Sequence, residues 1–278
     1  MTVINTNVNA LFSQNAMKVN NRNLSAAMEQ LSTGQRINSA KDDAAGLAIT
    51  NTMTSNIRGL SQAVRNANDG ISMLQTAEGA MIEQTNMLQR MRELAVQAGT
   101  ATYNTAQRGY LQLEFSALAV QINNIATQTT WNGDNLLDQT NAAITSGNYA
   151  FLVGAASGQT ITVNIPKVTT SSSGLAISGQ SISTPSGAMS ALSAIDTALQ
   201  SINKARATLG AGINQLTYAA DNLNNVIQNT TASRSQILDT DYAVATTKLA
   251  SSQIIAQAAT AMLAQANQSQ QGVLALLK

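Results

Sequence analysis

The feature that most constrains the fold is a long apolar repeat in the C-terminal half of the chain. Its members alternate at spacings of three and four residues, which is the heptad pattern of helices that pack along one face. Pro185 lies near its start and marks the first turn of the helix. A helix of this length with one apolar face needs partner helices. The members are Ala188, Leu192, Ile195, Leu199, Ile202, Arg206, Leu209, Ile213, Leu216, Ala220, Leu223 and Ile227.

Two helical runs in the N-terminal half supply candidate partners. The longer run covers 57–98 with one small phase slip, and the shorter covers 107–129 and ends at the turn-forming stretch WNGDN. We expect the longer run to pack antiparallel against the 188–230 helix, with the shorter run beside them. The predicted rod core consists of Ile57, Leu60, Val64, Ile71, Leu74, Leu118, Ile122, Leu199, Ile202, Leu209, Ile213, Leu216 and Leu223.

The 139–184 region between the helical halves has a different pattern. Apolar residues alternate with smaller ones over 149–153 and again over 161–165, on either side of the turn-forming stretch GAASGQ. Period-two alternation around a Gly-containing turn predicts a β-hairpin. We expect one further strand within 175–183.

Both ends of the chain carry apolar stripes as well. The N-terminal stripe has one slip and stops at Gly34, and the C-terminal stripe keeps the heptad pattern as far as Leu277. The two stripes can pair with each other, but this leaves the outer faces uncovered, so we expect other copies of the protein to cover them. The predicted self-assembly seam consists of Val8, Phe12, Val19, Leu24, Leu31, Leu249, Ala256, Ala259, Leu263, Val273 and Leu277.

These patterns together predict a mainly α fold. It is an elongated antiparallel helical coiled-coil rod with a small β-hairpin region, plus paired N- and C-terminal helices. The expected domains are a terminal-helix domain, 1–44 with 235–278, and a rod domain, 45–234.

The composition excludes several classes of function. The 278 residues contain no cysteine and no histidine, which removes thiolate and imidazole metal ligands, the commonest general base and the usual serine triad. Charged residues make up 10%, the net charge is +1 and aromatics are 3%, so no footprint for nucleic acid is present. No stretch is long and apolar enough for membrane insertion, and the first residues do not resemble a signal peptide. We therefore expect no enzyme, no cofactor and no bound metal.

Two acidic clusters have a structural and a chemical interpretation. Lys41, Asp42 and Asp43 could form a catalytic cluster, and Asp239 with Asp241 could hold a divalent cation. The first cluster lacks a neighbouring base or nucleophile, and the second lacks the further ligands of a calcium site. Helix capping, or a salt bridge between domains in the first case, is the favoured interpretation.

Long segments at both ends of the chain resemble bacterial flagellin. The segment LSTGQRINSAKDDAAGLAITNTMTSNIRGLSQAVRNANDGISMLQTAEGAM, followed by MLQRMRELAVQA, is similar to the N-terminal region of that family. SRSQILDTDYAVATTKLASSQIIAQAATAMLAQANQ is similar to its C-terminal region. The resemblance covers roughly 1–138 and 186–278, in the family's order and at its ends, and indicates a minimal form without large outer domains.

The resemblance implies a subunit of the flagellar filament, used for bacterial swimming motility. In that family the paired termini form the inner tube of a hollow helical homopolymer, and the rod forms the layer outside it. The implied further partners are an export chaperone on the C-terminal region, the filament cap and the hook-junction proteins. The implied location is the extracellular filament, reached through the flagellar secretion channel without a cleaved signal peptide.

The resemblance also implies a receptor-binding patch. Many flagellins are recognised by Toll-like receptor five of a host through an arginine, a leucine and a glutamate, and the matching residues here are Arg90, Leu94 and Glu114. Arg90 and Leu94 are four residues apart and share a helix face. Met91 stands where many receptor-active members have valine. The same face could instead serve subunit contacts alone.

Three alternative functions stay open at this point. A filament-junction, or hook-associated, protein would share the terminal helices, but the segments from Leu31 to Met81 and from Glu93 to Gln97 match flagellin itself. A secreted coiled-coil adhesin or translocator would need a membrane-inserting segment. An enzyme would need acid–base or metal-binding groups that the sequence lacks or scatters.

Overall fold

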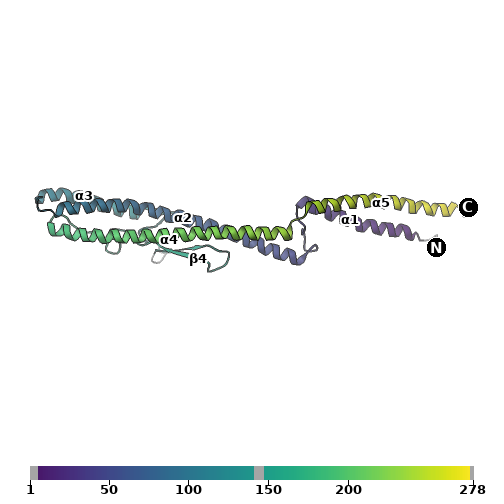
Figure 1. Cartoon of the computed structure of the whole chain (residues 1–278), viewed down its shortest axis with the longest axis horizontal. Coiled ribbons are helices and arrows are strands. Elements are labelled where there is room, and N and C mark those ends of the chain that lie inside the picture. Colours follow the sequence, from purple (N-terminus) through teal and green to yellow (C-terminus); the bar gives the residue numbers. More distant parts are fainter. Residues whose placement is uncertain (1–5, 141–146, 276–278) are drawn as a thin grey trace. The chain divides into compact units, whose positions relative to one another are not determined.

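The computed structural model describes residues 6–140 and 147–275, with side chains up to Ser269. Within them it contains five α-helices and two short antiparallel strand pairs (Figure 1). Backbone contacts divide the chain into two units. We call Met1–Ile57 with Gln228–Lys278 the terminal unit and Arg58–Ile227 the rod unit. The mainly α fold predicted from the heptad patterns is confirmed.

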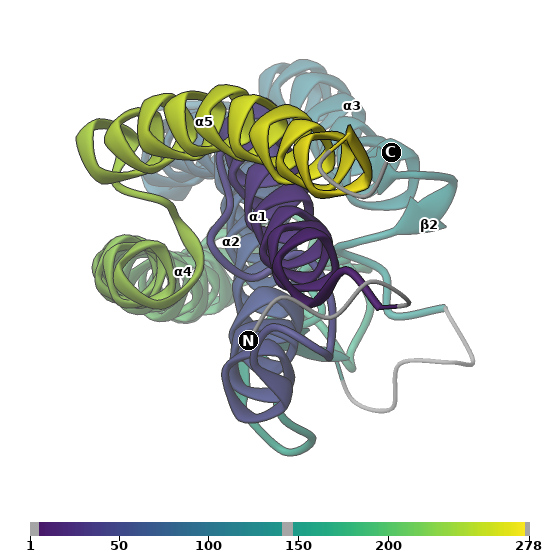
Figure 2. The same ribbon diagram turned by 90° about the vertical axis from the view of Figure 1, so that its right-hand side faces the viewer.

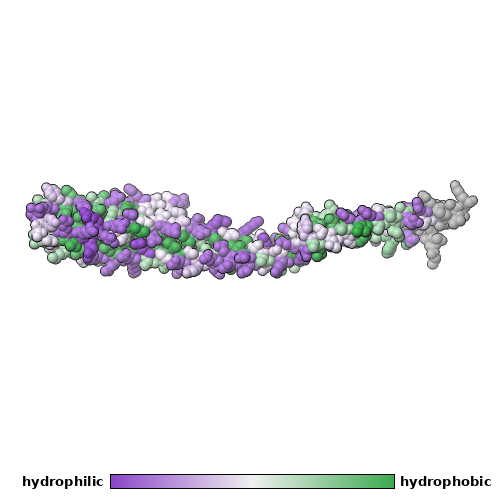
Figure 3. Space-filling model, turned by 45° about the horizontal axis from the view of Figure 1, so that its top comes forward, coloured by the Kyte–Doolittle hydropathy of each residue, from purple (hydrophilic) through white to green (hydrophobic). Residues whose placement is uncertain are grey.

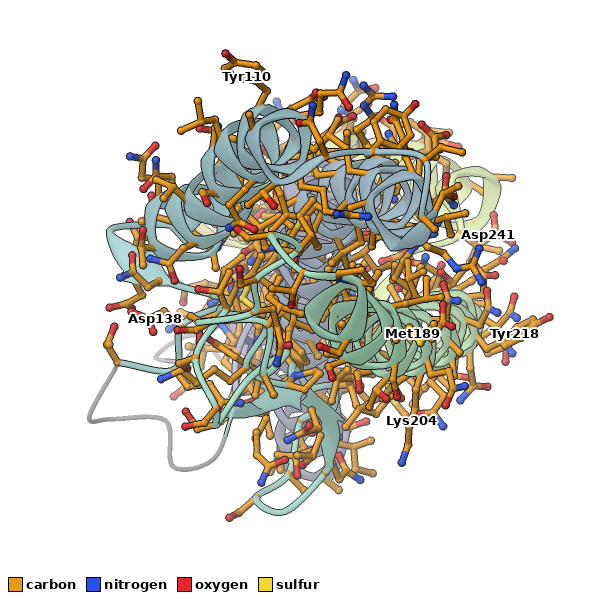
Figure 4. All side chains as sticks on the ribbon, turned by 90° about the vertical axis from the view of Figure 1, so that its left-hand side faces the viewer. Tyr110, Asp138, Met189, Lys204, Tyr218 and Asp241 are labelled. Carbon is orange, nitrogen blue, oxygen red and sulfur yellow. The ribbon has the colours of Figure 1, made fainter. Side chains whose placement is uncertain are left out.

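Three helices supply the rod unit: α2 (Ala44–Gly99), α3 (Thr105–Gln128) and α4 (Pro185–Leu238). The first residues of α2 and the last of α4 belong to the terminal unit. In Figure 4 side chains fill the space between the three helices, while Tyr110 and Tyr218 point outward. The predicted rod core divides by burial. The buried members are Leu74, Ile122, Ile202, Leu209, Leu216 and Leu223, and the half-buried members are Leu60, Val64, Ile71, Leu118, Leu199 and Ile213. Ile57 is half-buried as well but belongs to the terminal unit.

Polar side chains define where α2 ends and α3 begins. The buried Arg108 guanidinium donates hydrogen bonds to the carbonyls of Ala98, at 2.8 Å, and Thr100, at 2.9 Å. Those carbonyls lie where α2 ends and its own N–H donors run out. Asn104 accepts from the Gln107 N–H, and the Gln107 side chain accepts from the Asn104 N–H, so a capping box starts α3.

Two hairpins follow α3. β1 (Thr130–Trp131) pairs with β2 (Asp134–Asn135) around Asn132 and Gly133, whose φ values of 51° and 90° suit a tight two-residue turn. β3 (Asn148–Leu152) pairs antiparallel with β4 (Thr160–Asn164). The second pair is the hairpin that the alternating pattern predicted.

The β3–β4 hairpin lies close to the helices because glycines leave room for it. A Cβ on Gly70 of α2 would come within 2.8 Å of the Phe151 ring, and one on Gly212 of α4 within 2.7 Å of Val163. Both values are shorter than van der Waals contact, so each glycine admits a side chain of the hairpin into the core.

The additional strand expected within 175–183 is absent from the described residues, and that prediction was wrong. The backbone there folds back on itself: Leu175 N–H donates to the Thr169 carbonyl, at 2.8 Å, and Ser178 N–H to that of Thr170, also at 2.8 Å. Ala176 and Gly179 have φ values of 54° and 81°, which break a strand. The apolar alternation reflects the burial of Leu175, Ile177 and Ile182 without strand pairing.

The terminal unit is built on α1 (Val8–Thr33) and α5 (Tyr242–Ala275), which lie side by side and antiparallel (Figures 1 and 2). Gly34 ends α1 in a left-handed conformation, with φ 72°, and its N–H donates to the Gln30 carbonyl. The stop predicted at Gly34 is confirmed.

Candidate self-assembly surface

The inner face of the α1–α5 pair is made of small and polar residues. Ala27 and Ala245 are fully covered. Asn20 and Ser252 are buried as well, and the Asn20 side-chain amide donates to the Ser252 carbonyl at 2.8 Å. Farther along, the Asn7 amide donates to the Ala266 carbonyl at 3.2 Å. Small side chains let the two helices approach closely. The side-chain amides of α1 find their hydrogen-bond acceptors on the backbone of α5.

The predicted seam residues fall into three groups. On α5, the stripe faces α1: Leu249, Ala256, Ala259 and Leu263 are half-buried. On α1, Leu24 and Leu31 are half-buried, whereas Val8, Phe12 and Val19 are exposed. The slip in the N-terminal stripe therefore marks a change of face. The Val273 side chain and Leu277 lie outside the described residues.

A second apolar set lies on the outside of the pair. We call it the outer apolar face. Phe12 is 79% exposed and Ile254 is 66% exposed, which is unusual for large apolar side chains. Figure 3 shows green apolar atoms along these helices. Ten exposed large apolar side chains among the described residues of two helices indicate that other molecules contact this pair. Its members are Val8, Leu11, Phe12, Val19 and Met28 on α1 and Tyr242, Val244, Ile254, Ile255 and Met262 on α5.

Only part of this surface was visible in the sequence. The heptad count found Val8, Phe12 and Val19 but assigned no role to Tyr242, Val244, Ile254, Ile255 or Met262. These residues lie off the main stripe of α5. Val244, Ile255 and Met262 recur at spacings of eleven and seven residues and form a second apolar stripe, which was the signal that could have identified these three.

One aspartate of each acidic cluster caps a helix. Asp43 accepts from the Gly46 N–H at 2.8 Å, and Asp241 accepts from the Ala243 N–H at 2.9 Å. Asp42 instead accepts from the Ser39 hydroxyl and from the Ser39 and Asn38 N–H groups. The hydrogen bond from the Ser39 hydroxyl is the main reason why the pKa of Asp42 lies below its usual value. Capping by Asp241, one of two candidates, was predicted from the sequence.

The proposed receptor patch is an ion-paired site on the rod unit. Arg90 Nε lies 2.9 Å from Glu114 Oε1, and Arg90 Nη1 lies 2.9 Å from Glu93 Oε2. The bonds to Glu114, and then to Glu93, raise the pKa of Arg90. Both charged residues of the patch are exposed, but Leu94 is only 1% exposed and belongs to the core. The four-residue spacing therefore does not bring Arg90 and Leu94 to one surface.

Two ion pairs between α2 and α4 were not predicted. Arg92 Nε lies 2.7 Å from Asp196 Oδ1, and Arg206 Nη2 lies 3.7 Å from Glu78 Oε1. Arg206 is the one charged residue of the long apolar repeat, and its irregularity was the available signal. In the first pair α2 supplies the arginine, and in the second pair α4 supplies it. A slide of α4 that brought Arg206 opposite Arg92 would therefore place two positive charges together.

Residues 6–140 and 147–275 contain no group of three or more His, Cys, Asp or Glu side chains that could hold a metal ion. Among the same residues, no helix is both long and apolar enough to cross a membrane.

Comparison with known proteins identifies the family. The bacterial flagellin N-terminal helical region matches residues 4–142, and the bacterial flagellin C-terminal helical region matches residues 192–277. The chain belongs to the bacterial flagellin family. The resemblance found in the sequence is thereby confirmed, and the two matched regions contain α1, α2, α3, α5 and the part of α4 from residue 192 onward.

Individual flagellins match over nearly the whole chain. A flagellin of Halalkalibacterium halodurans is 42% identical over 276 residues, covering 99% of this chain and 100% of the relative. The flagellar filament 33 kDa core protein of Treponema phagedenis is 40% identical over 285 residues, with the same coverage. The crystal structure of Bacillus cereus flagellin is 31% identical with a TM-score of 0.50, covering 57% of this chain and 88% of that one.

Proposed function

We propose that this chain is the structural subunit of a bacterial flagellar filament and that it polymerises through its terminal unit. Family membership establishes the class, because flagellins are structural proteins that self-assemble into filaments. The observation that carries the role of the terminal unit is the outer apolar face. These large side chains are exposed although α1 and α5 already cover each other's inner faces.

A second copy of the chain fits this face. Burying an apolar side chain contributes roughly 1.5–3 kcal/mol, and each subunit would bury several in the polymer. A heterologous contact between unlike surfaces does not close on itself, so it propagates into an open helical filament. The terminal domain, 1–44 with 235–278, then forms the inner tube, and the rod domain, 45–234, with its β-hairpin region forms the layer outside it.

The partners implied by the family fit the same surface. Before assembly, Tyr242, Val244, Ile254 and Met262 of α5 leave apolar surface that an export chaperone would shield. At the two ends of a polymer the last subunits leave their contacts open, which the filament cap and the hook-junction proteins would cover. The chain would reach an extracellular filament through the flagellar channel, without a cleaved signal and while incompletely folded. The absence of cysteine fits this route, because no disulfide has to form.

Recognition by Toll-like receptor five is a finer proposal. Arg90 and Glu114 supply an exposed, charged contact on adjacent helices, α2 and α3. Leu94 would act from beneath, by holding the α2 surface in place, since its side chain is buried. If neighbouring subunits cover this face in the filament, the monomer would signal and the filament would not.

Electron microscopy tests the main proposal directly. Purified protein, salted out and viewed in negative stain, should form long tubular filaments without any other component. A chain that stays monomeric alone, but joins the end of a preformed filament, would support the junction-protein alternative and contradict the proposal.

A further inference from the structure

The inner face of the α1–α5 pair does not by itself specify one register. The α5 positions that face α1 are Leu249, Ser252, Ala256, Ala259, Leu263 and Ala266. A slide of one heptad exchanges leucine and alanine at positions 249, 256 and 263 but keeps the face apolar, so packing favours one register only in part. The amides of Asn20 and Asn7 bond backbone carbonyls, which every register offers. A separate feature must select the register.

Such a feature lies where the two helices meet the rest of the terminal unit. Gln35 and Asp239 form an isolated antiparallel β-bridge. Thr240 N–H donates to the Gly34 carbonyl at 3.0 Å, and Arg36 N–H donates to the Leu238 carbonyl at 2.7 Å. We call Gly34–Arg36 with Leu238–Thr240 the junction bridge. It directly follows α1, and Asp241 alone separates it from the first residue of α5.

Arg36 contributes its side chain as well as its backbone. Its Nη2 donates to the Ile237 carbonyl at 2.6 Å, so one residue bonds two of the last carbonyls of α4. Those carbonyls have no partner within the helix, and a cation at a helix C-terminus also interacts favourably with the helix dipole. Arg36 is thus anchored to the end of α4, immediately beside the point where the chain turns into α5.

The contacts run in one continuous antiparallel register. They proceed from Gly34 and Thr240, through Asn20 and Ser252, to Asn7 and Ala266. The junction bridge is the part of this series that cannot slide, because α4 has one C-terminal end and at most two residues separate the Gln35–Asp239 bridge from α1 and α5.

We propose that the junction bridge sets the register of the α1–α5 pair and that Arg36 is its positioning residue. The register decides which outer apolar residues of α1 lie beside which of α5, and so the pattern that a neighbouring subunit meets. The consequence for assembly rests on the proposed function, whereas the consequence for pairing within one chain does not.

The cysteine-free sequence makes the register measurable by cross-linking. Ala27 and Ala245 are both buried on the inner face, between the junction bridge and the Asn20–Ser252 contact. A full-length chain carrying Ala27→Cys and Ala245→Cys reports the register seen here upon mild oxidation. A chain carrying Ala27→Cys and Ser252→Cys reports a slide of one heptad. Non-reducing gels separate disulfides within a chain from those between chains.

Each reporter is combined with Arg36→Pro, which removes both donors, with Arg36→Ala, which removes the side chain alone, and with Arg36→Lys. Arg22→Ala, an exposed arginine on α1, is the matched control. The parent and the control should favour the first reporter over the second by about tenfold or more. Arg36→Pro should abolish this preference, Arg36→Ala should weaken it, and Arg36→Lys should restore part of it by keeping the charge at the end of α4.

Undiminished selectivity in Arg36→Pro, with the rod unit still helical by circular dichroism, would overturn the proposal. Filament yield is measured on the same samples without reporter cysteines. Lost register with normal filaments would overturn the link to assembly alone. A third outcome separates this proposal from the proposed function. If Arg36→Pro loses the register while Phe12→Asp and Leu263→Asp polymerise normally, the junction bridge still sets the pairing, but the terminal unit is not the assembly surface.

Discussion

The side-chain amide of Asn20 donates a 2.8 Å hydrogen bond to the backbone carbonyl of Ser252, and both residues are buried although 232 positions separate them. This contact joins the two ends of the chain in the middle of the α1–α5 pair. Because the acceptor is a carbonyl, the contact requires a donor on α1, and an isosteric acceptor at position 20 should disrupt it.

Asn20→Asp should therefore weaken the pair in a pH-dependent way. Burial and the facing carbonyl oxygen disfavour the carboxylate, so the pKa of the new side chain is raised in the pair. Stability is then retained below the unfolded pKa, about 3.9, and lost as the pH rises through the raised value. At pH 7 the cost is several kcal/mol. Hydrogen exchange of the α1 and α5 amides measures it.

Asn21→Asp is the matched control for that experiment, because Asn21 is the next residue of α1 and is exposed. Its protection should follow the parent at every pH. Equal protection of Asn20→Asp and Asn21→Asp at pH 7 would mean that the α1–α5 contact does not form as described.

Phe12→Asp separates pairing within the chain from contact between chains. Since Phe12 is 79% exposed, the substitution should change the free energy of unfolding of the isolated chain by less than about 0.5 kcal/mol. In a filament the same side chain would place a carboxylate in a dry interface, so salting-out should give no filaments. Asn15→Asp, at an exposed polar position of the same helix, should polymerise normally. Filaments of ordinary length from Phe12→Asp would remove this residue from the interface.

Leu263→Asp tests the inner stripe of α5. Leu263 is half-buried beside α1, and a carboxylate there costs several kcal/mol per subunit. The rod unit should keep its helical circular dichroism and its melting temperature, but no filaments should be visible in the microscope. Gln257→Asp, exposed on the same helix, is the control. A Leu263→Asp chain that polymerises as readily as Gln257→Asp would show that α5 is not the assembly seam.

Arg90→Ala tests the receptor proposal. The variant loses the ion pairs with Glu114 and Glu93, both exposed, so the melting temperature should change little. Signalling by monomer through Toll-like receptor five should weaken strongly. Arg92→Ala breaks the comparable exposed pair with Asp196 and should signal like the parent. Equal signalling by the two variants at equal monomer purity would withdraw the assignment.

The helices and the main hairpin could be predicted because each is encoded by a local period. Heptad spacing identified α2, α4 and α5, and two-residue alternation identified β3 and β4. The strand prediction for 175–183 failed because alternating burial also occurs in a segment that folds back on itself. There the Leu175 N–H donates to the carbonyl of Thr169 and pairs with no neighbouring strand. Local periods carry no information on long-range bonds, so neither Arg36 with Leu238 nor Asn20 with Ser252 was foreseen.

The face of α1 was ambiguous for the same reason. Phe12 and Leu24 both fit a helical stripe, and only the position of α5 decides that Leu24 turns inward while Phe12 stays exposed. The phase slip between them arises because Leu24 lies on the face of α1 that contacts α5, whereas Phe12 lies on an exposed face. Likewise, sequence spacing placed Arg90 and Leu94 together, although burial separates them.

In the β3–β4 hairpin, the residues that pack the strands against the helices are distinct from the residues that connect the two strands. Gly70 and Gly212 leave room for the strands against the helices, whereas the connecting residues 155–159 are all exposed, and Gly158 has open space around it. Val153 N–H and the Gln159 carbonyl, 2.9 Å apart, keep the two ends of this connection together. Lengthening a loop whose ends are already fixed adds little entropic cost. The fold should therefore tolerate a peptide or a whole domain inserted after Ser157, and any filament would display that insertion once per subunit.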